Sequence, residues 1–221
     1  MTDDSSPARA IDVVVFDVGE TLIDETALWL HAAELTGVPA FTLMGVLGGL
    51  AARGEPHTRV WEILGVERPT STWAPAAFYP DALPCLARLR EEGFTTGAVG
   101  NTPVEAEAIL TPHVDFVGSS ARWGAQKPSP AFFARLAREA GAPPDRIAYV
   151  GDRVDNDIEP AIDAGMVAVH IRRGPWGLLH ASPPAAFVIR SLDELPGILS
   201  RVPPRAARRG PRRTGSRGDV P

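Results

Sequence analysis

The chain has one cysteine among its 221 residues and one lysine among its 22 lysine and arginine residues. A single cysteine excludes an internal disulfide, and Cys85 lies on the apolar side of a predicted helix, which is typical of a buried structural thiol. The chain also lacks an apolar run long enough to cross a bilayer, and its first residues show no basic-then-apolar leader pattern. We therefore expect a cytoplasmic protein with no membrane partner.

Positive charge is scarce over most of the chain. Residues 201–221 hold seven arginines and one acid, so the other 200 residues hold 15 basic and 26 acidic side chains, a net charge of −11. This tail is rich in arginine, proline and glycine and nearly lacks apolar residues, which predicts disorder. Its arginines are not interleaved with aromatic residues, as they are in proteins that stack single-stranded bases, so we expect no nucleic-acid partner.

The single lysine, Lys127, stands just before a segment with helical periodicity. Lysine places a compact charge on a thin stem, whereas arginine presents a broad planar fork, so the two do not exchange in a tight pocket that holds a carboxylate or phosphate. A lysine considered alone is more typical of a solvated loop. The surrounding motifs therefore decide between a site residue and a surface residue.

Short apolar segments alternate with segments of helical periodicity. The predicted strands are residues 11–16, 94–100, 146–150 and 166–171, and the predicted helices are residues 81–92, 104–110, 130–140 and 156–164. This alternation predicts an α/β fold with a Rossmann-like, three-layer core, in which helices cover both faces of a parallel sheet. Ligands bind such sheets at the carboxyl ends of the strands, and Asp17, Asn101 and Asp152 each follow a predicted strand.

One long segment interrupts the alternation. It contains amphipathic helical stretches at residues 25–35, 41–52 and 57–64 and no convincing strand. We interpret it as a small all-helical cap, inserted after the first strand and placed over the site that this strand helps to form. The expected domains are a core of residues 1–23 and 79–200, a cap of residues 24–78 and a disordered tail of residues 201–221.

Four short motifs carry the chemistry. They are FDVGETL at residues 16–22, VGNT at residues 99–102, Lys127-Pro128, and VGDRVDND at residues 150–157. Their order and spacing resemble the haloacid dehalogenase superfamily, in the branch with a helical cap inserted after the first motif. The resemblance extends over about residues 11–190. It implies a hydrolase, most simply a Mg²⁺-dependent phosphatase acting on a small phosphorylated metabolite.

The resemblance also implies roles for individual residues. Asp17 would attack phosphorus and form an aspartyl-phosphate. Lys127 would neutralise the nucleophile and the transferring group, and the Thr21 hydroxyl would orient the loop and the phosphate. Asp17 and Asp152 would bind Mg²⁺ directly through hard carboxylate oxygens, with Asp157 as an outer partner. The mutual repulsion of these carboxylates would be relieved by Mg²⁺ and by Lys127.

The chain departs from the superfamily pattern at Gly19. Phosphatases that resemble it carry there a second aspartate that protonates the leaving group, a step worth roughly 10²–10⁴-fold in rate. Gly19 retains the backbone carbonyl that would contact the metal, but it has no proton to give. We therefore expect slow hydrolysis of alkyl phosphates, unless Glu20 or an acid from the cap takes over this step.

A second departure is at Gly100, where relatives place a serine or threonine whose hydroxyl holds the phosphate. The backbone N–H groups of Gly100 and Asn101, the Asn101 amide or the Thr102 hydroxyl would bind the substrate instead.

Two other functions stay open: a metal-independent carbon–halogen hydrolase, and a catalytically impaired binding or regulatory protein. The first needs no leaving-group proton, but such dehalogenases usually place an aromatic residue at position 19 and lack the acidic cluster. The sequence does not predict the oligomeric state.

Overall fold

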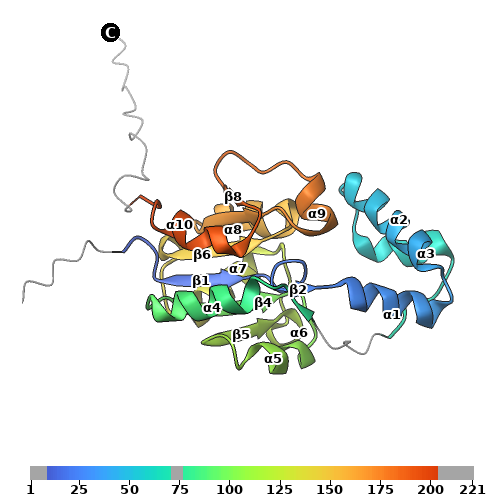
Figure 1. Ribbon diagram of the computed structural model, residues 1–221, viewed down its shortest axis with the longest axis horizontal. Coiled ribbons are helices and arrows are strands. Elements are labelled where there is room, and N and C mark those ends of the chain that lie inside the picture. Colours follow the sequence, from blue (N-terminus) through green and yellow to red (C-terminus); the bar gives the residue numbers. More distant parts are fainter. Residues whose placement is uncertain (1–8, 71–76, 204–221) are drawn as a thin grey trace, which may run out of the picture.

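A six-stranded parallel sheet forms the centre of the protein, in the order β5-β4-β1-β6-β7-β8 (Figure 1). The computed structural model describes residues 9–70 and 77–203. The strands are β1 (Val13–Phe16), β4 (Thr95–Gly100), β5 (Phe116–Ser119), β6 (Ile147–Gly151), β7 (Val167–Ile171) and β8 (Phe187–Ile189). All four predicted strands are present, and β5 and β8 extend the sheet at its two edges.

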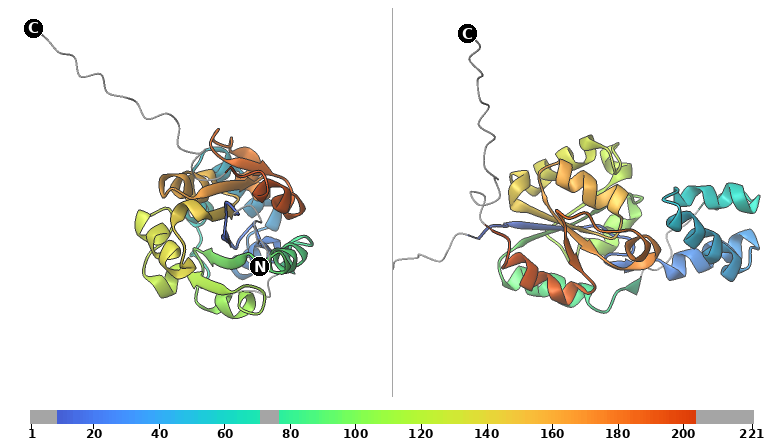
Figure 2. Two further views of the ribbon diagram at one scale, coloured as in Figure 1. Left: turned by 90° about the vertical axis from the view of Figure 1, so that its left-hand side faces the viewer. Right: turned by 90° about the horizontal axis from the view of Figure 1, so that it is seen from above.

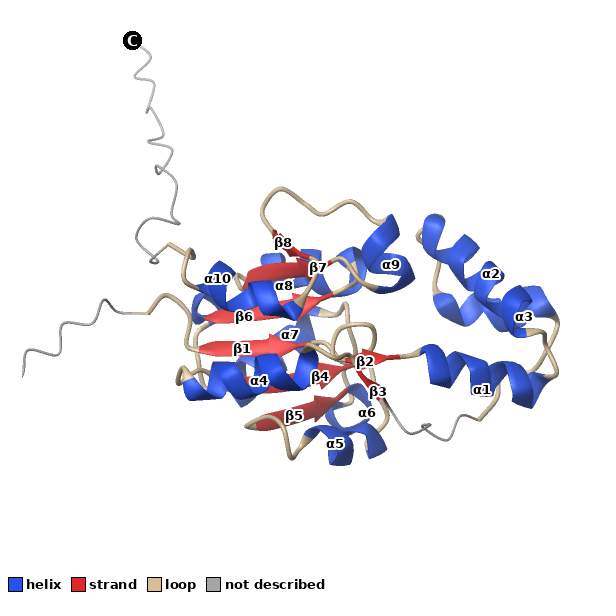
Figure 3. Ribbon diagram, viewed as in Figure 1, coloured by secondary structure: helices blue, strands red, loops and turns tan. Residues whose placement is uncertain are grey.

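Helices cover both faces of the sheet (Figure 3). On β1, Val14 and Phe16 belong to a core cluster with side chains of α4 (Ala82–Glu91) and α10 (Leu195–Leu199). The alternate residues Val13 and Val15 belong to a second cluster with side chains of α7 (Pro130–Ala140) and α8 (Glu159–Asp163). This alternation along one strand confirms the predicted three-layer, Rossmann-like α/β fold.

The other core elements are short. They are α5 (Glu105–Leu110), α6 (Ser120–Trp123), α9 (Gly174–Leu179), η2 (Pro144–Arg146), η3 (Val154–Ile158) and η4 (Leu192–Glu194). The single helix predicted over residues 156–164 is divided into the wide π turn η3 and the helix α8. Pro160 lies in the first turn of α8, where a backbone N–H would have no partner within this helix, so proline is tolerated there. Cys85 is buried on α4, as its position in the pattern predicted.

A separate helical unit stands beyond the carboxyl ends of the strands (Figure 2). It comprises α1 (Thr26–Thr36), α2 (Ala40–Ala52), η1 (His57–Arg59) and α3 (Val60–Leu64). Leu43, Leu47, Leu50 and Val60 are buried in its own apolar cluster, which Trp176 of α9 joins from the core. The helical unit therefore contacts the core chiefly through α9, to which α2 packs.

The chain enters and leaves the helical unit through two very short strands, β2 (Ile23–Asp24) and β3 (Ala77–Phe78). They pair antiparallel, with Ile23 opposite Phe78 and Asp24 opposite Ala77. The expectation of no strand within residues 24–78 was therefore wrong at both ends of that segment, because a two-residue strand is too short to show a period in the sequence. The division of the chain into three domains with the boundaries given above stays a prediction.

Within the described residues, no single helix has both the length and the apolar character needed to span a membrane. Helices α1 and α2 pass that test only as a pair, and they are bent by 120° relative to each other. The predicted disordered tail falls outside the described residues from residue 204 onward.

Candidate active site

Three buried carboxylates meet at the carboxyl ends of the central strands. Asp17 and Asp152 follow the neighbouring strands β1 and β6, and turn η3 brings Asp157 to the same place. One carboxylate oxygen of each residue lies within 4.8 Å of those of the other two, and all three side chains are buried. The structure thus brings together the three aspartates that the sequence had singled out.

Lys127 lies between two of these carboxylates. Its Nζ donates hydrogen bonds to Asp17 Oδ1 at 2.6 Å and to Asp157 Oδ1 at 2.5 Å, and the residue is only 3% exposed. Burial alone would lower the lysine pKa, but the charges of Asp157 and Asp17 outweigh it and hold the pKa well above its ordinary value. The solvated-loop alternative for Lys127 was therefore wrong, and the ammonium is charged within the site.

Two neighbours hold this lysine in place. Asn101, which follows β4, receives the Lys127 backbone N–H on its Oδ1 at 2.8 Å and donates from Nδ2 to the Lys127 carbonyl at 3.0 Å. The Tyr149 hydroxyl of β6 donates to the Val99 carbonyl at 3.3 Å and reaches Asp157 Oδ1 at 3.5 Å, and its ring lies 5.8 Å from the ammonium. The amide of Asn101 thus positions Lys127, and its contact with substrate stays a prediction. The role of Tyr149 was missed because a tyrosine inside an apolar strand is indistinguishable from a packing residue.

Negative charge exceeds positive charge within this cluster, which suits a divalent cation. Burial, followed by the charges of Asp157 and Asp17, raises the pKa of Asp152 well above its usual range. Burial and then Asp17 raise the pKa of Asp157 to about 6, although Lys127 acts in the opposite direction. Carboxylate oxygens are the ligands that Mg²⁺ prefers, so the donor set and its excess charge both fit this ion.

Two buried threonine hydroxyls, in the segments that follow β1 and β4, have no hydrogen-bond partner within the described residues. Thr21 and Thr102 are both buried, and neither Oγ1 is paired within the described part of the chain. A buried hydroxyl left unpaired costs about 1–3 kcal/mol, so these groups are suited to receiving an anion. The predicted roles of Thr21 and Thr102 toward phosphate are compatible with this placement.

Gly100 lies too close to the nucleophile for a side chain. A Cβ atom built on Gly100 would lie 3.0 Å from Asp17 Oδ1 and 3.2 Å from Val18 Cγ2. A serine or threonine at this position would therefore crowd the Asp17 carboxylate, which gives a physical reason for glycine here. The predicted contact of substrate with the Gly100 backbone stays a prediction.

The space beside Gly19 is filled by a carboxyl group from another element. A Cβ atom built on Gly19 would lie 2.2 Å from Glu25 Oε1 and 2.8 Å from Glu25 Cδ. Glu25 immediately precedes α1, and its Oε2 accepts a hydrogen bond from Trp29 Nε1 at 3.3 Å. Burial, then the charges of Glu20 and Asp17, raise the pKa of Glu25 to about 7. No sequence motif pointed to Glu25, because only the fold brings it beside position 19.

Glu20, the acid next to Gly19, is already engaged. Its Oε1 accepts the Glu25 backbone N–H at 2.9 Å, and its Oε2 accepts the Tyr79 hydroxyl at 2.6 Å. Its backbone has a φ of 52°, which is uncommon for a residue other than glycine. Its carboxylate lies against Gly174 at the start of α9, where an added Cβ atom would lie 2.7 Å from Oε2.

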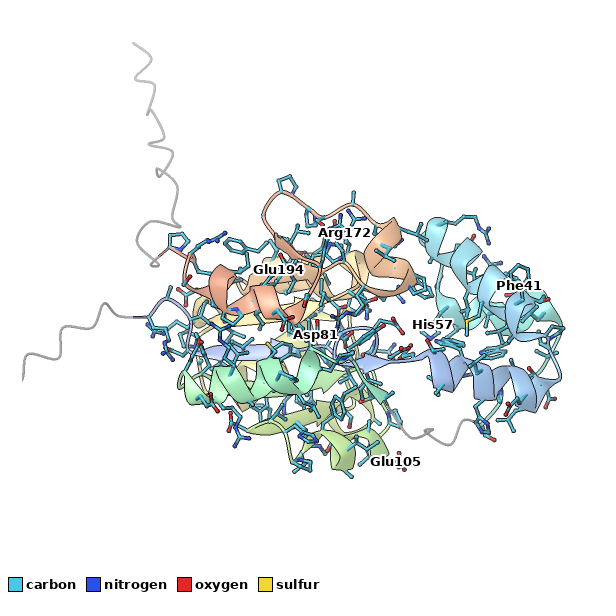
Figure 4. The ribbon with its side chains drawn as sticks, viewed as in Figure 1. Phe41, His57, Asp81, Glu105, Arg172 and Glu194 are labelled. Carbon is cyan, nitrogen blue, oxygen red and sulfur yellow. The ribbon has the colours of Figure 1, made fainter. Side chains whose placement is uncertain are left out.

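Aromatic side chains line the contact between the helical unit and the core. His57 lies on the side of the helical unit that faces the core (Figure 4), with its ring 6.1 Å from that of Trp29 and 6.2 Å from that of Trp176. Burial, then the charge of Arg153, lower the pKa of His57 to about 4, so the imidazole is neutral at pH 7. The Arg153 guanidinium lies 5.0 Å from the Trp176 ring centroid. This contact therefore gathers the rings of Trp29, His57 and Trp176 and the guanidinium of Arg153, the residue that precedes η3.

The sequence pattern of the haloacid dehalogenase-like hydrolases matches residues 11–165, well over half of the chain. The chain belongs to this family. Its match includes Asp17, Lys127, Asp152 and Asp157, whose side chains meet in the site described above.

Curated relatives of this family member include two archaeal proteins named glyceraldehyde 3-phosphate phosphatase. That of Methanopyrus kandleri is 42% identical over 104 residues, which cover 44% of this chain and 45% of the relative. That of Methanocaldococcus jannaschii is 32% identical over 130 residues, covering 56% and 57%. The chain thus spans about half the length of the curated relatives it matches.

Solved structures confirm the fold of this haloacid dehalogenase-like hydrolase. A structure described as a dehalogenase with intermediate complex aligns with a TM-score of 0.68 at 20% identity, covering 88% of this chain and 99% of that one. The putative HAD-hydrolase YfnB of Bacillus subtilis, described as bound to magnesium, aligns with a TM-score of 0.66 at 18% identity, covering 86% and 99%. At these identities the similarity is one of fold alone.

Proposed function

We propose that the protein is a Mg²⁺-dependent phosphatase that acts on a small phosphorylated metabolite through an aspartyl-phosphate on Asp17. The observation that carries this proposal is the buried cluster in which Lys127 bridges Asp17 and Asp157 while Asp152 lies within 4.8 Å. Phosphoryl transfer depends mainly on positioning and on charge stabilisation, which such a cluster provides. The names of the archaeal relatives support a phosphate ester as the substrate.

Each group has a place in the proposed reaction. An Asp17 carboxylate oxygen attacks phosphorus, and the bond from phosphorus to the leaving oxygen breaks. Lys127 keeps the carboxylate oriented and offsets charge on the transferring group, while the Thr21 and Thr102 hydroxyls donate to phosphoryl oxygens. Water then hydrolyses the aspartyl-phosphate and regenerates Asp17.

The metal would be held by Asp17, Asp152 and the Gly19 carbonyl, with Asp157 as an outer partner. Bound there, Mg²⁺ would supply positive charge to the phosphoryl oxygens. The helical unit would act as the predicted cap, because it stands over the carboxyl ends of the strands where substrate must enter (Figure 2). Its contacts with α9 would exclude water from the reacting atoms.

The test is phosphate release by the purified protein with Mg²⁺, using glyceraldehyde 3-phosphate and p-nitrophenyl phosphate. We expect hydrolysis that a chelator stops and Mg²⁺ restores, and that Asp17→Asn abolishes. Glu105→Gln is the matched control, since it neutralises an exposed carboxylate on α5 that has no part in the proposed reaction (Figure 4). Release of chloride from 2-chloropropionate without metal, and no release of phosphate from a panel of esters, would contradict the proposal in favour of the dehalogenase alternative. Absence of both chemistries would favour the binding-protein alternative.

A further inference from the structure

We propose that Glu25 is the catalytic acid of this site and donates the leaving-group proton from the space that a side chain at position 19 would fill. This inference rests on the proposed phosphatase function. It assigns the proton-donating step to a residue six positions further along the chain, at the start of the helical unit rather than in the loop after β1.

The first argument is one of position. A side chain at position 19 would have to begin where Glu25 already lies, because a Cβ atom there would overlap Oε1 at 2.2 Å, Cδ at 2.8 Å and Cγ at 3.5 Å. A carboxyl group two residues after the nucleophile would start from this same point. Because Gly19 has no side chain, the Glu25 carboxyl can occupy this volume. An acidic group therefore lies at position 19 although residue 19 itself carries none.

The second argument concerns how Glu25 is held. Trp29 Nε1, one helical turn further along, donates to Oε2, and the Glu25 backbone N–H is bound by Glu20. Trp29 in turn stacks on Trp61 with ring centroids 6.1 Å apart. One carboxyl oxygen is therefore anchored in the helical unit, while Oε1 remains directed at Gly19. Within the described residues no hydrogen-bond donor binds Oε1, so Glu25 is an anchored acid suited to delivering a proton to a fixed place.

The third argument excludes the neighbouring acid. Both carboxylate oxygens of Glu20 accept hydrogen bonds, from Tyr79 and from the Glu25 backbone. Glu20 therefore acts as a positioning residue that fixes the start of α1.

The proposed step balances. As an Asp17 oxygen forms its bond to phosphorus, the electron pair of the breaking P–O bond passes to the leaving oxygen, and the Glu25 proton moves to that oxygen to give the free alcohol. Glu25 is left as a carboxylate. It then takes a proton from the water that attacks the aspartyl-phosphate, so that inorganic phosphate leaves and both Asp17 and Glu25 are restored.

The experiment compares two esters in parallel. A p-nitrophenyl leaving group departs without a proton, whereas the alcohol of an alkyl phosphate such as glyceraldehyde 3-phosphate requires one. We expect Glu25→Gln to lower kcat/KM for the alkyl ester by roughly 10²–10⁴-fold and that for the aryl ester by less than about threefold. Glu20→Gln is the matched control, since it alters the support of α1 and should lower kcat/KM for both esters by the same factor.

A rescue variant tests the position directly. Gly19→Asp alone would displace the Glu25 carboxyl, so it is combined with Glu25→Ala, which clears the space. We expect kcat/KM for the alkyl ester to be at least about tenfold higher in Gly19→Asp/Glu25→Ala than in Glu25→Ala. Equal losses on both esters in Glu25→Gln, or an unchanged alkyl rate, would overturn the inference while leaving the phosphatase function intact. Failure of the unaltered protein to hydrolyse even the aryl ester would overturn both.

Discussion

Replacing Lys127 by methionine removes the ammonium group from the carboxylate cluster but keeps a side chain of similar length. In the native protein this ammonium lies 2.6 Å from one Asp17 oxygen and 2.5 Å from one Asp157 oxygen, and the lysine side chain is 1% exposed. Without it, three buried carboxylates face one another without the cation that bridges Asp17 and Asp157. We therefore expect Lys127→Met to lower the free energy of unfolding at pH 8 in metal-free buffer.

The magnitude follows from the burial of the pair. Removing one partner of a buried ion pair costs about 3–5 kcal/mol. For a chain of this size each kcal/mol corresponds to about 2–4 °C in Tm, so the expected fall is about 6–20 °C. Arg88→Met is the matched control, because Arg88 and Glu92 form an ion pair whose side chains are 59% and 38% exposed. An exposed pair of this kind contributes at most about 1 kcal/mol.

The loss should also depend on pH in a defined direction. Burial and Asp17 already raise the pKa of Asp157 to about 6, and loss of Lys127 removes a charge that lowers it. An acid whose pKa is higher in the folded state stabilises the fold while it is protonated, and that stability is lost as pH rises through the raised pKa. The deficit of Lys127→Met should therefore be larger at pH 8 than at pH 5, and Asp157→Asn added to it should restore part of the stability. Thermal unfolding followed by circular dichroism measures both effects. A deficit no larger than that of Arg88→Met, or one that does not change with pH, would refute the reasoning.

Two further predictions concern stability. The pKa of Glu25 is raised from 4.5 to about 7 in the folded protein, so its ionisation opposes folding as pH rises through this range. In metal-free buffer at pH 8, Glu25→Gln should therefore raise the free energy of unfolding by roughly 1–3 kcal/mol and raise Tm accordingly. Below pH 4.5 the substitution should leave Tm unchanged. Equal effects at both pH values would contradict the assignment of this pKa. Gly97→Ala should destabilise the protein by about 1–3 kcal/mol, because a Cβ atom on Gly97 of β4 would lie 2.3 Å from the Phe116 ring of β5. In the control, Gly45→Ala of α2, the added Cβ atom meets nothing within 4 Å, so denaturant unfolding should show a gain of up to about 1 kcal/mol.

The sequence predicted the fold wherever the pattern was strong. The run of apolar residues ending at Phe16 and the one ending at Val150 became the central strands β1 and β6. The edge strand β5 was missed because its four residues, FVGS, combine two apolar residues with glycine and serine. The edge strand β8 is only three residues long. Such strands are specified by pairing with a neighbour more than by their own composition.

The candidate site was predictable to the extent that each residue followed a strand or belonged to a motif. Asp17, Asp152 and Lys127 were found in this way, and the structure places them together. The sequence left open an acid from the cap as proton donor, but the position of Glu25 beside Gly19 was not predictable, because it depends on how the helical unit is set against the loop after β1. Nor was the use of the Asn101 amide to hold the Lys127 backbone, which links residues 26 positions apart.

The overlap between Glu25 and the missing side chain of Gly19 bears on how active members of such a family are recognised. A search that requires an acidic residue at a fixed spacing from the nucleophile would discard this chain as inactive. A search for any carboxyl oxygen within a small sphere around that position would keep it, because Glu25 Oε1 lies 2.2 Å from the point where a Cβ atom would stand. If Glu25 has the proposed role, the volume that a proton donor occupies is a better criterion than its place in the chain.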